Sequence, residues 1–367
     1  MRKRVFLSPP HMGGGEMEFI KEAFARNYIA PLGENVTGFE EDIKAFTGAE
    51  NALALSSGTA ALHLALLSLG IKAGDRVMAS SLTFIGSVSP ITFIGAEPIF
   101  IDSDKKSWNL DPNLLEDAVR RERPKALILT HLYGCCADLE AIGRICDQWG
   151  VVLIEDAAES LGAVYKERQS GTIGAAGIYS FNGNKIITTS GGGMLVSQSE
   201  AVARRASFLS TQAREPVAHY EHNEIGFNYR MSNILAGIGR GQMRVLSDRV
   251  RRRREIFSFY RSALNDLPIE FMPEISGSRS NRWLSAILLN DSRVTTEAAR
   301  LALERKNIES RPLWKPMHAQ GAFSGAKRYV TGVSEDLFAR GLCLPSGSQM
   351  NEDDLWLTAE TIRNIFR

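Results

Sequence analysis

The stretch ALALSSGTAALHLALLSLG, residues 52–70, predicts a buried strand, a small polar turn and an apolar helix in immediate succession. In that order, free backbone N–H groups and the positive end of the helix dipole face one point beside residues 56–59. Such a point is suited to bind a phosphate group. An ordinary strand-to-helix turn, whose glycine relieves steric crowding, explains the same residues equally well.

Short apolar runs alternate with helical patterns after this stretch, and continuous apolar runs of this length are typical of strands buried on both faces. A helix start is visible at Asp111, because Pro112 and apolar positions at helical spacing follow it. The alternation predicts an α/β fold with a mainly parallel sheet. The predicted strands are residues 52–55, 76–80, 97–102, 126–134, 151–156, 177–181 and 193–197.

The length of the chain favours two domains, since 367 residues exceed the usual size of one compact core. A long helix is expected to begin near Ser232 and to run past the arginine run RRRRE at 251–255. The segments NRWLSAILL, NIESRPLW and GLCLPS that follow suggest a smaller sheet with flanking helices. We therefore predict a large domain over residues 1–250 and a small α+β domain over residues 251–367.

The charge balance gives no general attraction for polyanions, because 43 lysines and arginines face 42 aspartates and glutamates. Nucleic acid and membranes are therefore not expected partners, and the arginine run is interpreted as a solvated helix face. The start of the chain lacks a long apolar region, so we expect a cytoplasmic protein. Its four cysteines have no metal-ligand spacing, and neither a metal nor a disulfide is expected.

Two carboxylates end the predicted strand VVLIED at 151–156, where parallel strands open onto a ligand crevice. Asp156 is well placed there to hold a cationic heterocycle. Capping of the next helix by Asp156 is the simpler explanation when this segment is taken alone.

Lys185 stands among small polar residues in SFNGNKIITTSGGGML, residues 180–195. A lysine held near a positive ring and a phosphate seat loses its proton readily and can attack a carbonyl. Glycines at 191–193 would let the backbone pass close to a ligand, and Ser180 can offer its hydroxyl to a phosphate. An exposed lysine that only adds solubility is the ordinary alternative.

Three segments in this order, SSGTAAL, EDAAES and SFNGNKIITTSGGG, resemble the pyridoxal-phosphate-dependent sugar aminotransferases of the DegT/DnrJ/EryC1/StrS family. The resemblance covers nearly the whole chain. It implies an aspartate aminotransferase-like (type I) fold, in which the N-terminal segment contributes to the active site. The other matching segments are NYIAPLGE at 27–34, HLYG at 131–134, GFNYRMSNI at 226–234, RPLWKPMH at 311–318 and LCLPSG at 342–347.

The resemblance also implies a role for each matching residue. Lys185 is similar to the lysine that binds pyridoxal 5′-phosphate covalently and later carries a proton, and Asp156 to the carboxylate that pairs with the ring nitrogen. Asn228 resembles an asparagine that reaches the phosphate from the neighbouring subunit, which implies a homodimer with shared active sites. The remaining cofactor-binding residues implied are Gly58, Thr59 and Ser180 at the phosphate, Phe84 and Ala158 on the two ring faces, and Glu159.

The expected reaction is amine transfer, because family members that act as sugar dehydratases have histidine in place of Lys185. Glu159 resembles members that act at C-4 of the sugar. The segments THLYG, STQARE, HYEH, SRSNRWLS and SRPLWKPMH are most similar to enzymes that aminate a UDP-linked 4-keto-6-deoxy-N-acetylglucosamine on the bacillosamine route, with L-glutamate as expected donor. A GDP- or dTDP-linked 4-keto-6-deoxy sugar, a generic keto acid, and a non-catalytic cofactor-binding regulator are the alternatives.

Cationic and flat aromatic side chains are needed for the nucleotide diphosphate, the donor carboxylate and the base. A structural role is an equal alternative for each of them. The predicted substrate-binding residues are Tyr220, Arg230, Arg311, Trp314, Lys315 and His318.

Overall fold

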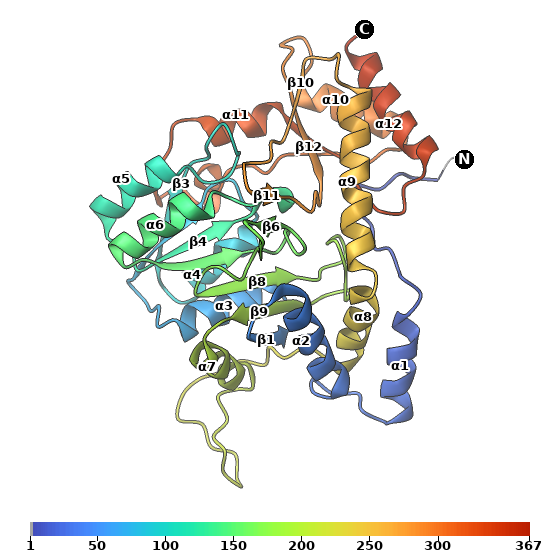
Figure 1. Cartoon of the computed structure of the whole chain (residues 1–367). Coiled ribbons are helices and arrows are strands. Elements are labelled where there is room, and N and C mark those ends of the chain that lie inside the picture. The colour runs from blue at the N-terminus through green and yellow to red at the C-terminus, as the bar shows by residue number, and fades with distance from the viewer. Residues whose placement is uncertain (1–2) are drawn as a thin grey trace.

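The computed structural model describes residues 3–367, so the first two residues of the predicted large domain lie outside it. Its centre is an eight-stranded sheet between two layers of helices (Figure 1). Strand β9 runs opposite to the other seven strands. In spatial order the strands are β1 (Asn51–Leu55), β9 (Gly193–Ser197), β8 (Ala176–Ser180), β5 (Val152–Asp156), β4 (Ala126–Thr130), β2 (Arg76–Ser80), β3 (Glu97–Ile101) and β14 (Lys327–Tyr329).

Separate apolar clusters cover the two faces of this sheet, which is why its strands are apolar at nearly every position. On one face α3 (Gly58–Ser68), α4 (Ser89–Phe93) and α7 (Glu200–Ser210) pack against the strands. On the other face lie α5 (Pro112–Glu122) and α6 (Leu139–Trp149). Asp111 caps α5 by accepting from the N–H of Asn113, as the Asp-Pro sequence predicts.

A second, antiparallel sheet lies beyond the first and is covered by helices with a core of their own. Its strands, in spatial order, are β10 (Ile269–Phe271), β12 (Ser285–Leu289), β15 (Gly341–Leu344) and β13 (Arg311–Pro312). The helices of this part are α9 (Leu246–Ala263), α10 (Thr296–Arg305), α11 (Val333–Arg340) and α12 (Glu352–Ile365).

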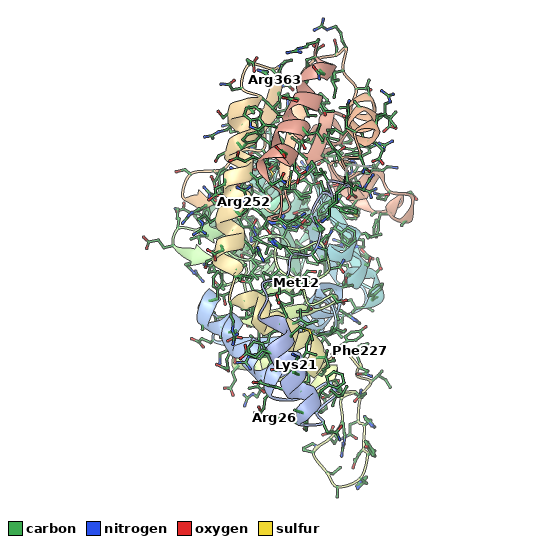
Figure 2. The ribbon with its side chains drawn as sticks, turned by 90° about the vertical axis from the view of Figure 1, so that its right-hand side faces the viewer. Met12, Lys21, Arg26, Phe227, Arg252 and Arg363 are labelled. Carbon is green, nitrogen blue, oxygen red and sulfur yellow. The ribbon has the colours of Figure 1, made fainter. Side chains whose placement is uncertain are left out.

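The helix predicted from Ser232 past residue 255 is two helices. Helix α8 (Asn233–Met243) ends before Arg244 and Val245, and α9 begins at Leu246. Val245, at the break, has a backbone conformation outside the helical region, with φ −114° and ψ 2°. Figure 2 shows α9, marked by Arg252, extending upward from the lower part of the molecule, where α1 (Glu16–Ala25) carries Lys21. Helix α2 (Glu34–Thr47) also lies in this lower part, against α8.

The predicted division at residue 250 falls inside α9, and two strands from beyond it join the first part of the chain. Strand β14 completes the edge of the large sheet beside β3. Strand β11 (Ser278–Arg279) pairs with β6 (Val164–Tyr165), which also pairs with β7 (Arg168–Gln169). The domain bounds therefore stay a prediction. Across residues 3–367, every helix is too short or too polar to span a membrane.

Candidate active site

A cavity of about 910 Å³ lies at the carboxyl ends of β4 and β5, where parallel strands present their last side chains. Thr130 and Asp156 are those last residues, and they are direct neighbours across the two strands. The opposite wall comes from the second sheet and its loops, and the N-terminal residues 6–10 also line the cavity. Both parts of the chain therefore build the site.

The N-terminus of α3 opens into this cavity. Ser57 caps the helix by accepting from the N–H of Ala60 at 3.0 Å, and Gly58 and Thr59 begin its first turn. The first N–H groups of a helix have no partner within it, so they attract an anion. A Cβ atom on Gly58 would lie 3.3 Å from the Cβ of Ser180, which explains the glycine.

Gly193 makes an even closer approach. A Cβ atom there would lie 2.3 Å from the carbonyl carbon of Ser57 and 2.4 Å from the nitrogen of Gly58. Of the predicted glycine run, Gly191 and Gly192 line the cavity, whereas Gly193 lets β9 pass against the turn before α3. Gly193 therefore fixes the position of the helix terminus.

Asp156 is buried, and both of its carboxylate oxygens accept hydrogen bonds. Oδ1 accepts from the N–H of Ala158 at 3.1 Å, and Oδ2 accepts from the hydroxyl of Ser87. The hydroxyl of Thr83 lies 2.9 Å from that of Ser87 and 2.8 Å from that of Thr130. Three hydroxyl groups thus form a chain that ends on the carboxylate.

Lys185 reaches the same cavity. Its side-chain nitrogen lies 3.6 Å from Oε1 of Glu159 and 4.2 Å from the centre of the Trp283 ring. Glu159 also accepts from the N–H of Tyr133 at 2.7 Å. Burial, with the charge of Asp156, raises the pKa of Glu159 to about 7 and outweighs the opposing effects of Lys185 and the Tyr133 N–H. A buried carboxyl that titrates near neutrality therefore faces the lysine.

A hydrogen-bonded support lies behind the Lys185 loop. The carbonyl of Asn184 accepts from the Ser8 hydroxyl at 2.6 Å and from the indole N–H of Trp283 at 2.8 Å. Arg253 donates to Ser8 and to the carbonyl of Trp283. Burial and the nearby charge of Arg249 lower the pKa of Arg253 to about 9. The N-terminal segment thus orders the loop before the lysine.

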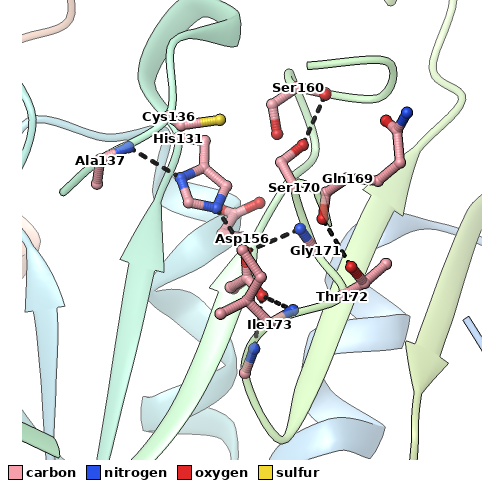
Figure 3. A network of polar contacts seen from close by, with 12 residues as sticks. His131, Cys136, Ala137, Asp156, Ser160, Gln169, Ser170, Gly171, Thr172 and Ile173 are labelled. Carbon is pink, nitrogen blue, oxygen red and sulfur yellow. Dashed lines mark hydrogen bonds and ion pairs between the residues drawn. The ribbon is translucent and has the colours of Figure 1, made fainter. Parts of the chain in front are cut away.

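On the other face of β5, Glu155 binds a fully buried histidine and a loop. His131 lies between Ala137 and the end of β5 (Figure 3). Its Nδ1 accepts from the N–H of Ala137 at 3.2 Å, which assigns the proton to Nε2 and makes Nε2 the donor to Glu155 at 2.8 Å. The carboxylate also accepts from the N–H groups of Gly171, Ile173 and Gly174.

These donors set the charge of Glu155. Burial opposes ionisation, but the hydrogen bond from His131, its electrostatic effect and the hydrogen bonds from the backbone N–H groups outweigh burial and lower the pKa of Glu155. Because Glu155 and Asp156 are consecutive in β5, the contacts behind the strand also fix the backbone that presents Asp156 to the cavity.

Ten residues predicted for the site line this one cavity. Phe84 is 55% exposed, and its ring centre lies 5.8 Å from that of Trp314. Arg311 pairs with Glu309, with 3.0 Å between nitrogen and oxygen. The ten residues are Gly58, Thr59, Phe84, Asp156, Ala158, Glu159, Ser180, Lys185, Arg311 and Trp314.

The other five predicted residues do not line it. Asn228 pairs with Thr211 at the base of the segment that projects between α7 and α8, and Tyr220, farther along that segment, is 78% exposed. Arg230 pairs with Glu40 at 3.0 Å. His318 is buried and hydrogen-bonded to Ser81 and Glu335, and Lys315 lies outside the cavity.

Sequence reasoning missed several lining residues. Tyr133 lies in the matched segment HLYG but was given no role, although its left-handed conformation, with φ 49°, aims its N–H at Glu159. The other missed residues include Ser87, Thr83, Thr130, Trp283, Cys343, Asn182, Asn184, Glu309 and residues 6–10. Some of them stand in segments that match the family, as Trp283 does in SRSNRWLS, but nothing in those segments separates them from their neighbours.

The family model of the DegT/DnrJ/EryC1/StrS aminotransferases matches residues 10–363. The chain belongs to this family. It is 51% identical over 376 residues to EpsN of Bacillus subtilis (strain 168), whose name assigns it provisionally as a pyridoxal phosphate-dependent aminotransferase; the alignment covers 100% of this chain and 97% of EpsN. It is 35% identical over 364 residues to a GDP-perosamine synthase of Escherichia coli O157:H7, with 99% of each chain covered.

The solved structures agree with this membership in the DegT/DnrJ/EryC1/StrS family. The aminotransferase TlmJ from Streptoalloteichus hindustanus superposes with a TM-score of 0.92 at 27% identity and covers 98% of each chain. The chain therefore has the type I fold of these enzymes. It is a pyridoxal phosphate-dependent aminotransferase that acts on a nucleotide sugar.

The residues of the cavity fit this cofactor. The open first turn of α3 suits its phosphate, and the carboxylate of Asp156 suits a protonated ring nitrogen. Lys185 is the one lysine among the lining residues and can form a covalent bond with the carbonyl carbon. Among residues 3–367, no group of three or more His, Cys, Asp or Glu side chains is arranged to bind a metal ion.

Proposed function

We propose that this aminotransferase moves the amino group of L-glutamate to C-4 of a UDP-linked 4-keto-6-deoxy-N-acetylhexosamine. The product would be UDP-4-amino-4,6-dideoxy-N-acetylglucosamine, for cytoplasmic synthesis of glycans of the bacillosamine type. One observation supports amine transfer above the others: Lys185 and Asp156 line the same cavity as an open helix N-terminus. A nucleophile, an anion for a ring nitrogen and a phosphate seat are the three parts that such chemistry needs.

Lys185 would act first as nucleophile and then as base and acid. When bound, pyridoxal phosphate supplies a carbonyl carbon and a ring that accepts electrons. Once the amino donor displaces Lys185, the free amine of Lys185 can move the proton between the donor carbon and the cofactor. Such a transfer is typically worth about 10²–10⁴-fold in rate. The same residue would serve the reverse transfer to the sugar, which accounts for two half-reactions with one lysine.

Glu159 would assist Lys185 in both half-reactions. It lies 3.6 Å from the lysine nitrogen, and its pKa is raised to about 7 by burial first and by Asp156 second. A carboxyl with such a pKa exchanges protons readily at neutral pH. We therefore assign it the task of holding a proton while Lys185 changes between its bound and free forms.

We further propose that two chains share their active sites in a homodimer. Asn228 and Tyr220 belong to the segment that projects from the body of the chain, so they do not reach their own cavity. A projecting segment with exposed Ile225 and Tyr220 is suited to pack against a second copy. Asn228 would then reach the phosphate of the partner subunit.

Arg311 and Trp314 are the proposed contacts of the sugar nucleotide within one chain, because they line the cavity beside Phe84. Arg311 offers a planar cation for the diphosphate or for the donor carboxylate. Arg230 and His318 are not among the lining residues and pair with Glu40 and Glu335, which favours structural roles for both.

A GDP-linked 4-keto-6-deoxy sugar is the second candidate substrate. The observation in its favour is the 35% identity to a GDP-perosamine synthase over 99% of both chains. Both candidates carry a 4-keto-6-deoxy sugar, so they differ mainly in the base and in the group at C-2 of the sugar. Residues that contact these groups would decide between them.

The visible absorption of the purified enzyme tests the proposal. Addition of L-glutamate should remove the absorption band of the lysine-bound cofactor, and the UDP-linked keto sugar alone should restore it. Restoration by the GDP-linked sugar alone would replace the first candidate by the second. A band that glutamate leaves unchanged would contradict the assignment of the donor, and a response to simple keto acids at equal rates would contradict a sugar substrate.

A further inference from the structure

The carboxylate of Asp156 is the end of a chain of buried hydroxyl groups. Ser87, Thr83 and Thr130 are each no more than 4% exposed, and consecutive oxygens in the chain lie within hydrogen-bond distance. Ser87 belongs to η1 (Ile85–Ser87), Thr83 to the loop before it, and Thr130 to the end of β4. Two separate segments thus supply the hydroxyl groups of the chain, of which only that of Ser87 donates to the carboxylate.

The chain has a fixed direction when Asp156 is ionised. A carboxylate only accepts hydrogen bonds, so the proton of Ser87 points to Asp156. The oxygen of Ser87 is then free to accept from Thr83, whose oxygen in turn accepts from Thr130. Each donation strengthens the next, because a donor whose oxygen accepts a hydrogen bond becomes more polar. With the N–H of Ala158 on the other oxygen, the arrangement holds the carboxylate in one orientation.

Packing alone does not require these hydroxyl groups. Alanine or valine would fill the same space without a polar atom, and a buried hydroxyl is costly unless it is hydrogen-bonded. The same loop carries Phe84, and both residues line the cavity, although Phe84 is 55% exposed and Thr83 is fully buried. One short segment therefore presents both an aromatic ring to the cavity and a hydroxyl chain to Asp156.

We propose that Ser87, supported by Thr83 and Thr130, is a positioning residue that orients the Asp156 carboxylate and so sets the charge on the ring nitrogen of the bound cofactor. The inference rests on the proposed role of Asp156. The charged groups that share the cavity with Asp156 are Lys185, Glu159, Glu309 and Arg311. Its neighbours in the loop and β4 are these uncharged hydroxyl groups.

The test is the pH dependence of the visible absorption of the holoenzyme, which reports the proton on the nitrogen that Lys185 contributes. When the Ser87 hydroxyl no longer donates to it, Asp156 takes a larger share of the proton that it holds with the ring nitrogen. The ring then withdraws fewer electrons. The lysine nitrogen then holds its proton more tightly. Ser87→Ala should therefore move the midpoint to higher pH by roughly half a unit.

Three further variants make this readout specific. Thr83→Val keeps the branched shape and removes the second hydroxyl, so it should give a smaller shift in the same direction. Ser87→Thr keeps the donor and should restore the midpoint of the unchanged enzyme. Ser89→Ala is the matched control, because the hydroxyl of the half-buried Ser89 donates to the carbonyl of Ile85 and not to Asp156. It should leave the midpoint unchanged.

The Asp156→Asn variant distinguishes a failure of the inference about the hydroxyl chain from a failure of the proposed role of Asp156. A large shift in Asp156→Asn with none in Ser87→Ala and Thr83→Val would overturn the role of the hydroxyl chain and leave that of Asp156 intact. An unchanged midpoint in Asp156→Asn would overturn both. If Ser87→Ala fails to retain the cofactor, the Thr83→Val variant decides in its place, since it acts one hydrogen bond farther away.

Discussion

The side-chain nitrogen of Lys185 lies 3.6 Å from Oε1 of Glu159, inside a cavity that also contains Asp156. Lys185→Ala removes both the nucleophile and the amine that moves the proton, so both half-reactions should slow by at least about 10³-fold. Stopped-flow absorbance with glutamate and with the sugar measures each half separately. Lys185→Arg, whose guanidinium stays charged, should be equally inactive. Turnover near the original rate in either variant would refute the role of Lys185.

Glu159 should make the cofactor-free protein less stable as the pH rises. Its folded pKa of about 7 lies above the ordinary value of 4.5, so the folded state binds more protons than the unfolded state between these values. Stability is therefore lost as pH rises through this window, by up to about 3 kcal/mol. Glu159→Gln should abolish this loss in urea unfolding at pH values on both sides of the window. The exposed Glu50→Gln is the control, and an unchanged pH dependence in Glu159→Gln would contradict the shift.

Glu155 should stabilise the fold in the opposite pH range. Glu155→Gln places an amide group among the N–H donors of Gly171, Ile173 and Gly174, and we expect a loss of about 2–4 kcal/mol at neutral pH. Because the folded pKa is lowered, the stabilisation is present above the unfolded pKa and lost as pH falls. The difference between the two proteins should therefore shrink in acid. A difference that stays constant with pH would count against this account.

Gly193 should be needed for cofactor binding. In Gly193→Ala the new methyl group meets the backbone of Ser57 and Gly58 and must displace the start of α3. Equilibrium dialysis should show cofactor affinity reduced by at least roughly tenfold, or about 1.4 kcal/mol. Gly143→Ala in α6 is the matched control, because a Cβ there meets no atom within 4 Å. Equal affinity of the two variants would show that the turn tolerates the displacement.

Arg311 should affect substrate binding more than the chemical step. Arg311→Ala removes the cation at the cavity wall, and we expect KM for the sugar nucleotide or for glutamate to rise roughly 10- to 100-fold with kcat little changed. Steady-state kinetics with each substrate varied in turn identifies which anion it binds. Arg293→Ala removes an exposed arginine that pairs with Asp291 and serves as control. A fall in kcat at constant KM would assign Arg311 to the chemical step instead.

The sequence predicted seven of the eight strands of the large sheet to within a few residues, because strands buried on both faces are continuous apolar runs, but it did not predict β14, which is short and polar. It predicted one helix instead of α8 and α9, since neither a proline nor a glycine stands at the break at Arg244 and Val245. In the site, Asp156 ends one strand and Lys185 follows another, and both could be assigned from the sequence. Ser87 and Trp283 were not assigned to the site, although Trp283 stands in the matching segment SRSNRWLS, because their distance to the cavity depends on how remote segments fold together.

Strand β14 forms one edge of the large sheet, and its late position in the sequence affects how the chain folds during synthesis. Residues 327–329 pair with β3, which ends at Ile101, so a ribosome makes β3 more than two hundred residues before the strand that covers its edge. Until then β3 presents unpaired backbone groups, which attract strands of other chains. The protein should therefore depend on protection during translation, and a chain shortened before residue 327 should aggregate even though it retains Lys185, Asp156 and the helix that begins at Gly58.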